Sequence, residues 1–266
     1  MKLHLKNIKF PTSIASLTAL PSGKLLINTI NAHSYNTAQE DTEFAKVLLS
    51  SDVLLPDGVS VVWAVRFLNG VKIQKIAGED LFFLEMKRLN KKPPSPLQIK
   101  KIGINCGVKE RMSVLFLGSS ESTLAKIKDR AGVEFPNVEV HTFSPPYKPE
   151  FSDEDNSAMI AAINTVQPDV LFVGMTAPKQ EKWAWKMIND KRLVINDCHI
   201  CCIGAVFDFY AGTVNRAPKW IINLGLEWLY RLVKEPKRMW RRYLIGNVKF
   251  VGYVLREKFE NLKMRR

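Results

Sequence analysis

Short apolar runs alternate along the chain with stretches in which apolar residues recur at helical spacing. Each run has the length of a buried strand and ends at a cluster of polar residues. The expected strands cover residues 24–29, 53–55, 114–118, 138–143, 170–174 and 199–203. Because regular alternation of strands and helices is typical of parallel sheets, the pattern predicts an α/β fold with a Rossmann-like, largely parallel sheet and helices on both faces.

The polar clusters after the strands are the candidates for chemistry, since the ligand crevice of an open α/β sheet lies outside the carboxyl ends of its strands. Asp57 stands at such an end, between the strand over 53–55 and an apolar helix over 58–69. A carboxylate there is typical of a general base. Asp is also a preferred helix N-cap, which would accept hydrogen bonds from the amides that follow it. The pattern leaves both interpretations open.

Three other junctions carry polar residues of interest. Thr29 and Asn31 follow the first strand, and Gln180 follows the strand over 170–174. Gly118 and the serines after it begin a helix, which is typical of a phosphate cradle or of an ordinary capped turn. Neither a GxGxxG nor a P-loop motif is present to decide between the two. Other helices are expected over 37–50 and 81–90 and before 167, with a loop over 91–101.

Composition points to a globular chain without a bound metal. The 266 residues are 46% hydrophobic, which is ample for a packed core. The first residues lack the apolar segment of a signal peptide, and no apolar run reaches the roughly 18 residues that span a bilayer, so a cytoplasmic location is expected. Cys198, Cys201 and Cys202 crowd one strand and Cys106 stands alone, so buried thiols are expected rather than a zinc site. Asp153 and Asp155 read as a solvated helix start rather than a metal-binding DxD motif.

Positive charge is concentrated at the C-terminal end. From Arg216 onward, fourteen Lys and Arg residues stand against four Glu residues, so this segment holds +10 of the net charge of +13. Such a segment is expected to meet an anionic partner. Aromatic and aliphatic residues are interleaved with the cations, which favours an amphipathic helical appendage over 213–266, next to an α/β domain over 1–212. Its apolar half fits an anionic membrane surface, the protein's own core or a subunit contact equally well.

Five short motifs occur in an order that is specific in combination. They are Pro56-Asp57-Gly58, Pro178-Lys179-Gln180-Glu181, the segment 204–212, Arg216-Ala217-Pro218-Lys219-Trp220, and the segment 226–238. Together they resemble the WecG/TagA/CpsF family of bacterial glycosyltransferases over nearly the whole chain. The resemblance implies an inverting, metal-independent transfer of N-acetylmannosamine or its uronic acid from a UDP-sugar donor to a polyprenyl-diphosphate-linked acceptor. Members act in the synthesis of wall teichoic acid, enterobacterial common antigen or capsule.

The resemblance also implies roles for individual residues. Asp57 matches the proposed general base, and no cofactor is expected. The predicted substrate-binding residues are Thr29, Asn31, Lys75, Gly118, Gln180, Asp208, Arg216, Arg231, Arg238 and Arg241. The last three match arginines of an appendage that closes over the site and contacts diphosphate, a group that the guanidinium fork suits. Their spacing of seven and three places them near one face if a single helix runs through them, although Pro236 can kink it. A solvated basic face is the alternative for these arginines.

Two other functions remain open at this stage. One is a capsule-type transferase that uses UDP-glucose or UDP-galactose. The other is a non-enzymatic, basic nucleotide- or nucleic-acid-binding protein, which would show salt-sensitive binding and no role for Asp57. We expect the transferase, with no nucleic-acid partner, at the inner face of the cell membrane as a peripheral protein and possibly as a homo-oligomer.

Overall fold

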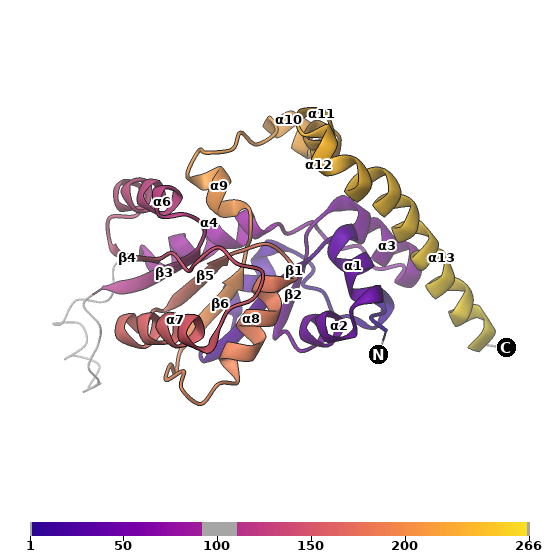
Figure 1. Cartoon of the computed structure of the whole chain (residues 1–266). Helices are drawn as coiled ribbons and strands as arrows, with labels where there is room; N and C mark the ends of the chain where they lie inside the picture. The colour runs from indigo at the N-terminus through magenta and orange to yellow at the C-terminus, as the bar shows by residue number, and fades with distance from the viewer. Residues whose placement is uncertain (1, 92–110, 265–266) are drawn as a thin grey trace.

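The computed structural model describes residues 2–91 and 111–264, so Cys106 and nearly all of the expected loop over 91–101 lie outside it. Six parallel strands form one sheet in the order β2-β1-β6-β5-β3-β4 (Figure 1). The strands are β1 (Lys24–Ile30), β2 (Val53–Pro56), β3 (Met112–Gly118), β4 (Val138–Phe143), β5 (Val170–Gly174) and β6 (Cys198–Cys202). This confirms the predicted α/β fold with a parallel sheet.

Helices cover both faces of the sheet, as predicted. On one face α4 (Gly78–Leu89), α6 (Glu121–Glu134) and α9 (Val206–Tyr210) bury one apolar cluster, in which Phe82, Phe116 and Phe172 pack at centroid distances of 5.3 to 6.2 Å. On the other face α7 (Asp153–Val166) and α8 (Lys179–Ile188) bury a second cluster around Leu171 and Val173. Successive residues of β5 thus point to opposite faces, which is why this interior strand is apolar along its whole length.

The helix expected over 37–50 is instead two helices, α1 (Ala32–Glu40) and α2 (Thr42–Leu49). Asp41 separates them because its carboxylate accepts a hydrogen bond from the Phe44 amide at 2.9 Å and so caps α2. The helix α3 (Val59–Asn69) follows β2 as predicted. Two short 3₁₀ turns, Leu5–Asn7 and Ile14–Ala19, precede β1.

The chain from residue 213 onward forms a series of helices that crosses from α9 to the far side of α1 and α3 (Figure 1). They are α10 (Lys219–Asn223), α11 (Glu227–Lys234), α12 (Pro236–Trp240), a π-helical turn (Arg241–Ile245) and α13 (Gly246–Met264). A break at Glu235 separates α11 from α12, because Pro236 has no N–H to continue α11. Arg231 and Arg238 therefore lie on separate helices, and the condition of one continuous helix is not met.

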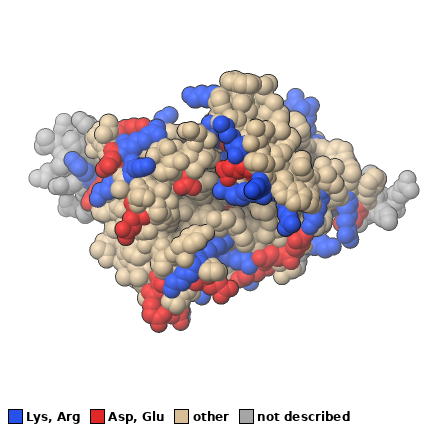
Figure 2. Space-filling model, turned by 45° about the horizontal axis from the view of Figure 1, so that its top comes forward, with Lys and Arg blue, Asp and Glu red and all other residues tan. Residues whose placement is uncertain are grey.

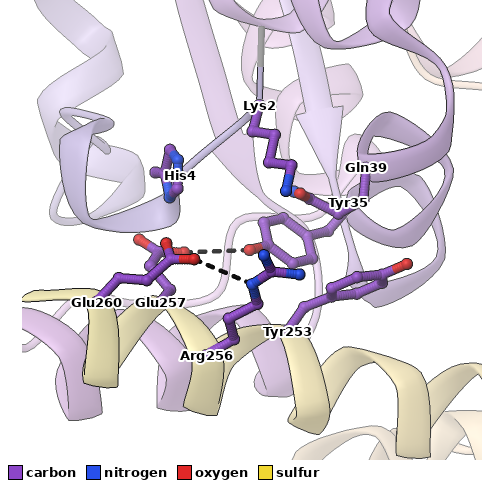
Figure 3. A pocket seen from close by; sticks show the side chains of 8 residues that line it. All are labelled: Lys2, His4, Tyr35, Gln39, Tyr253, Arg256, Glu257 and Glu260. Carbon is purple, nitrogen blue, oxygen red and sulfur yellow. Dashed lines mark hydrogen bonds and ion pairs between the residues drawn. The ribbon is translucent and has the colours of Figure 1, made fainter.

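The helix α13 is fastened to the α/β domain. Its Phe250 and Val254 share a buried cluster with Tyr35 of α1. The Glu257 carboxylate, 2% exposed, accepts hydrogen bonds from the Leu5 amide (3.1 Å), the Lys6 amide (2.8 Å) and the Tyr35 hydroxyl (3.1 Å). A pocket of about 210 Å³ opens beside this carboxylate, on the side of α1 where α13 meets the first residues of the chain (Figure 3). One face of α13 thus packs on the protein's own core, as one of the sequence alternatives proposed.

Several expectations from composition can be compared with the described residues. Cys198, Cys201 and Cys202 are buried, as predicted. Asp155 completes a capping box with Ser152 at the start of α7 and pairs with Lys148 at 2.6 Å. Across residues 2–91 and 111–264, no cluster of three or more metal-ligating side chains occurs. None of the helices in this part of the chain is long and apolar enough to cross a membrane.

Candidate active site

Asp57 is held at the carboxyl end of β2 by backbone contacts on both sides of the turn. Its amide donates to the Ile30 carbonyl at 2.9 Å, and the Ile76 amide donates to the Pro56 carbonyl at 3.1 Å. Gly58 follows with φ +132°, a backbone conformation that glycine adopts without strain, and it occupies the N-cap position of α3. The half-buried Asp57 carboxylate makes no hydrogen bond to any residue that the structure describes, so it is not the cap of α3.

The surroundings of Asp57 make it a stronger base than an ordinary carboxylate. Burial raises the pKa of Asp57, the negative charge of Glu227 adds to this effect, and the positive charges of Lys75, Arg231 and Arg216 oppose it. The net direction is upward. A carboxylate with a raised pKa holds a proton more tightly once it has accepted one, which is the property that a general base requires.

Glu227 organises two of the predicted arginines. Its carboxylate pairs with Arg216 at 3.2 Å and with Arg231 at 3.2 Å, and Arg216 also pairs with Glu79 at the start of α4. Burial would raise the pKa of Glu227, but the two arginines and Lys75 bring it below its usual value. Both guanidinium groups also lie beside the ring of Phe209, at 5.6 and 4.9 Å from its centroid. This network joins α4, α9 and α11 next to Asp57. Glu227 lies in the sequence motif 226–238, but it is not among the predicted site residues.

The other appendage arginines divide between the surface and the site. Arg238 is exposed and pairs with Glu235 at 2.9 Å. Burial raises the pKa of Asp208, and the positive charge of Arg238 partly offsets this effect. Arg241 is also exposed, and its guanidinium lies 5.3 Å from the Trp240 ring centroid. Arg242, which was not predicted, points inward. Its Nε is buried and has no hydrogen-bond partner among the described residues.

Arg242 lies within electrostatic range of the site. Burial lowers the pKa of Arg242, the neighbouring Arg231 and Arg238 lower it further, and the negative charge of Asp57 opposes them. His33, at the start of α1, has a pKa lowered to about 4 by burial and by Arg242, so its imidazole is neutral at neutral pH. Arg242 is thus the buried arginine of this turn that lies near Asp57, whereas Arg241 is exposed.

Thr29 and Asn31 lie beside the Asp57 turn, at the same edge of the sheet. Thr29 is half-buried and pairs with Leu55 in the register of β1 and β2. The Asn31 side-chain oxygen caps α1 by accepting hydrogen bonds from the His33 amide (3.0 Å) and the Ser34 amide (3.1 Å). A methyl group added at Gly58 would lie 3.7 Å from the Asn31 Cβ, so the cap packs against the Asp57 turn.

Gly118 and Gln180 have structural partners at neighbouring strand ends. A Cβ on Gly118 would lie 2.5 Å from the Gly174 carbonyl oxygen, so these two strand ends approach closely only because Gly118 has no side chain. Ser120 caps α6 by accepting a hydrogen bond from the Thr123 amide at 3.3 Å, as the capped-turn alternative proposed. Gln180 is buried, accepts from the Met175 amide at 3.3 Å and donates to Glu181 at 2.9 Å.

The structure thus places a carboxylate of raised pKa and several cations at the carboxyl edge of an open parallel sheet, which is the edge where α/β enzymes bind their ligands. The chain belongs to the glycosyl transferase WecG/TagA/CpsF family, whose family model matches residues 1–97 and 103–264. This confirms the resemblance drawn from the five motifs, and the chain is a member of a glycosyltransferase family.

Two curated relatives carry the same name, N-acetylglucosaminyldiphosphoundecaprenol N-acetyl-beta-D-mannosaminyltransferase. The protein of Bacillus subtilis (strain 168) is 30% identical over 233 residues, which are 88% of this chain and 80% of the relative. The protein of Bacillus spizizenii (strain ATCC 23059 / NRRL B-14472 / W23) is 29% identical over 237 residues, which are 89% of this chain and 81% of the relative. The similarity to both relatives therefore extends over most of this chain.

Proposed function

We propose that this protein transfers an N-acetylmannosamine-type sugar, with inversion, from a UDP-sugar to a polyprenyl-diphosphate-linked N-acetylglucosamine in cell-surface polysaccharide synthesis. The names of the two relatives support the acceptor and the sugar. The observation that carries the proposal is Asp57, a half-buried carboxylate with a raised pKa beside Lys75 and Arg231. One group that accepts a proton and several that stabilise negative charge are what such a transfer needs.

In the proposed reaction, Asp57 accepts the proton of the attacking acceptor hydroxyl. The hydroxyl oxygen forms a bond to the anomeric carbon while the bond from that carbon to the UDP oxygen breaks on the opposite face. The leaving diphosphate gains negative charge, which Lys75, Arg231 and Arg242 stabilise, so that cationic side chains perform the role that a metal ion has in other transferases. Glu227 keeps Arg216 and Arg231 in position through its two ion pairs.

The proposed location is the inner face of the cell membrane, where a lipid-linked acceptor is met. The net charge of +10 from Arg216 onward supports contact with anionic lipid. Figure 2 shows Lys and Arg side chains along the appendage, mixed with uncharged residues. In this proposal the appendage brings cations both to the membrane and to the site.

Asp57→Asn tests the assignment of the base. We expect its turnover to fall by about two orders of magnitude or more, because Asn cannot accept the proton. The measurement is UDP release with a short polyprenyl-diphosphate-linked N-acetylglucosamine, across a panel of UDP-sugars that includes UDP-glucose and UDP-galactose. Asp129→Asn, at an exposed position of α6, is the matched control and should turn over normally. Normal turnover by Asp57→Asn with the preferred donor would contradict the assignment, and preference for UDP-glucose or UDP-galactose would favour the capsule-type alternative.

A further inference from the structure

We propose that α3, in the α/β domain, inserts Trp63 and Phe67 into the interface of an anionic bilayer together with an apolar row on α13. The membrane-binding surface then spans both parts of the chain instead of the appendage alone. This inference rests on the proposed function, because a lipid-linked acceptor requires the site to lie at a membrane. We call Trp63, Phe67, Val248, Val251, Leu255 and Phe259 the bilayer face.

The α3 part of the bilayer face lies on the solvent side of that helix. Trp63 is 70% exposed and Phe67 is 49% exposed. They are four residues apart and so share one side of α3, together with Val59 one turn earlier. Val61, Ala64, Val65 and Leu68 occupy the opposite, buried side. Two large aromatic side chains thus stand side by side in solvent although α3 already has a complete core-facing side.

Both ends of this side of α3 contact the appendage. A Cβ on Gly225, in the turn between α10 and α11, would lie 3.1 Å from a Val59 methyl group. At the other end, Lys258 of α13 donates to the Phe67 carbonyl at 2.9 Å, and its Nζ lies 5.2 Å from the Phe67 ring centroid. Trp63 lies between these two contacts, so its exposed side chain emerges beside the appendage, where Figure 1 shows α3 next to α13.

The α13 part of the bilayer face borders α3. Val248, Val251, Leu255 and Phe259 are spaced by three, four and four residues, which places them on one side of the helix, and they are 42% to 74% exposed. Lys258, which reaches α3, follows Val251 by seven residues and Leu255 by three, so the row lies toward α3. The residues that fasten α13 to the core, among them Val254 and Glu257, are on another side. The two rows therefore form one surface.

The chemistry of this surface fits a lipid bilayer. Trp and Phe are suited to the boundary between headgroups and acyl chains. The cations of the appendage supply attraction to anionic headgroups. The helix α3 also begins directly after Asp57 and Gly58, so docking through Trp63 and Phe67 brings the site close to the headgroup layer. The diphosphate of a lipid-linked acceptor lies in that layer.

The test is co-sedimentation with vesicles made of equal parts phosphatidylglycerol and phosphatidylcholine. We compare the wild-type chain with the double variant Trp63→Ser/Phe67→Ser. Because α13 and the cations remain, we expect vesicle partitioning to fall about tenfold or more without vanishing. The matched control is Val133→Ser/Tyr147→Ser, which removes two exposed apolar side chains at a distance from the bilayer face and should bind like the wild type. Circular dichroism establishes that each variant is folded.

Activity measurements separate this inference from the proposed function. UDP release with a short-chain acceptor in detergent should be unchanged in the double variant, while release with a long-chain acceptor in vesicles should fall. Unchanged vesicle binding in the double variant would overturn the inference. If the wild type is a dimer and the double variant a monomer that still binds vesicles, Trp63 and Phe67 form a subunit contact and the inference is also overturned. If the wild type releases no UDP with any donor but the vesicle binding of the double variant falls as expected, the bilayer face stands and the proposed function fails.

Discussion

Arg242 has an unusual position for a guanidinium group. Its Nε is buried without a hydrogen bond in the described structure, and two further arginines lie within electrostatic range of it. An unpaired buried polar group costs stability, on the order of 1 to 3 kcal/mol. Such a cost is typical of a site arranged in advance for a ligand that completes it, and here the complementary ligand is an anion.

We predict that Arg242→Ala lowers kcat/KM by about 10- to 1,000-fold, because the leaving diphosphate loses a donor in a partly dry site. Arg241→Ala should have a much smaller effect, since Arg241 is exposed beside Trp240. UDP-release kinetics on both variants measure the difference. Equal losses in the two would show that the exposed side chain reaches the substrate and would contradict the inward role of Arg242.

Glu181 predicts a pH dependence of stability. It is buried with one side-chain oxygen lacking a partner in the described part of the chain, and burial raises its pKa to about 7. The folded state therefore binds a proton that the unfolded state has already released, and stability falls as the pH rises toward 7. Glu181→Gln should accordingly be more stable than the wild type at pH 8, with a free energy of unfolding higher by on the order of 2 kcal/mol. At pH 5 the two proteins should differ little. Urea unfolding at both pH values measures the difference. A stabilisation that is the same at both pH values would argue against titration of Glu181.

At the scale of elements, the close approach of strand ends and α9 limits which side chains fit. A Cβ on Gly174 would overlap the Phe207 ring, whereas Gly132 in α6 has open space around it. We predict that Gly174→Ala lowers the free energy of unfolding by about 1 to 3 kcal/mol. Gly132→Ala, the control, should raise it by about 0.5 to 1 kcal/mol because alanine favours the helix. Urea unfolding measures both, and an unchanged Gly174→Ala midpoint would mean that Phe207 moves away without cost.

The strands could be predicted because short, mainly apolar runs mark them, and the place of Asp57 because it follows such a run. The division between α1 and α2 was missed because the apolar spacing continues across Asp41, and only its hydrogen bond to Phe44 reveals a cap. Arg242 was missed for a different reason. The spacing from Arg231 to Arg241 places these arginines near one face only if a single helix runs through them, but the chain breaks at Glu235 and winds as a π-helix at Arg241–Ile245. A π-turn contains more residues than an α-turn, so it changes which neighbour faces inward.

At the scale of the molecule, carboxylates attach the appendage at two places, in addition to its contacts with α3. Near Asp57, Glu227 links Arg231 of α11 to Arg216, which also pairs with Glu79 of α4. At the other end, Glu257 fastens α13 to α1 and to the first 3₁₀ turn. Arg242 lies between these two attachments, so its position depends on both. The sequence predicted a basic helical appendage, but both attachments involve acids far from their partners in the chain, which a linear pattern cannot reveal.

The Glu257 contact also bears on how the protein acquires its activity during folding. It joins Glu257 to Leu5, which is 252 positions away in the sequence. A contact between such distant residues carries a large loop-closure cost until the intervening chain is ordered, so we expect it to form late. A chain with a finished sheet but an undocked α13 would hold Asp57 in place and still lack Arg242. Catalytic competence would then arise in the last step of folding, after the α/β domain has become stable.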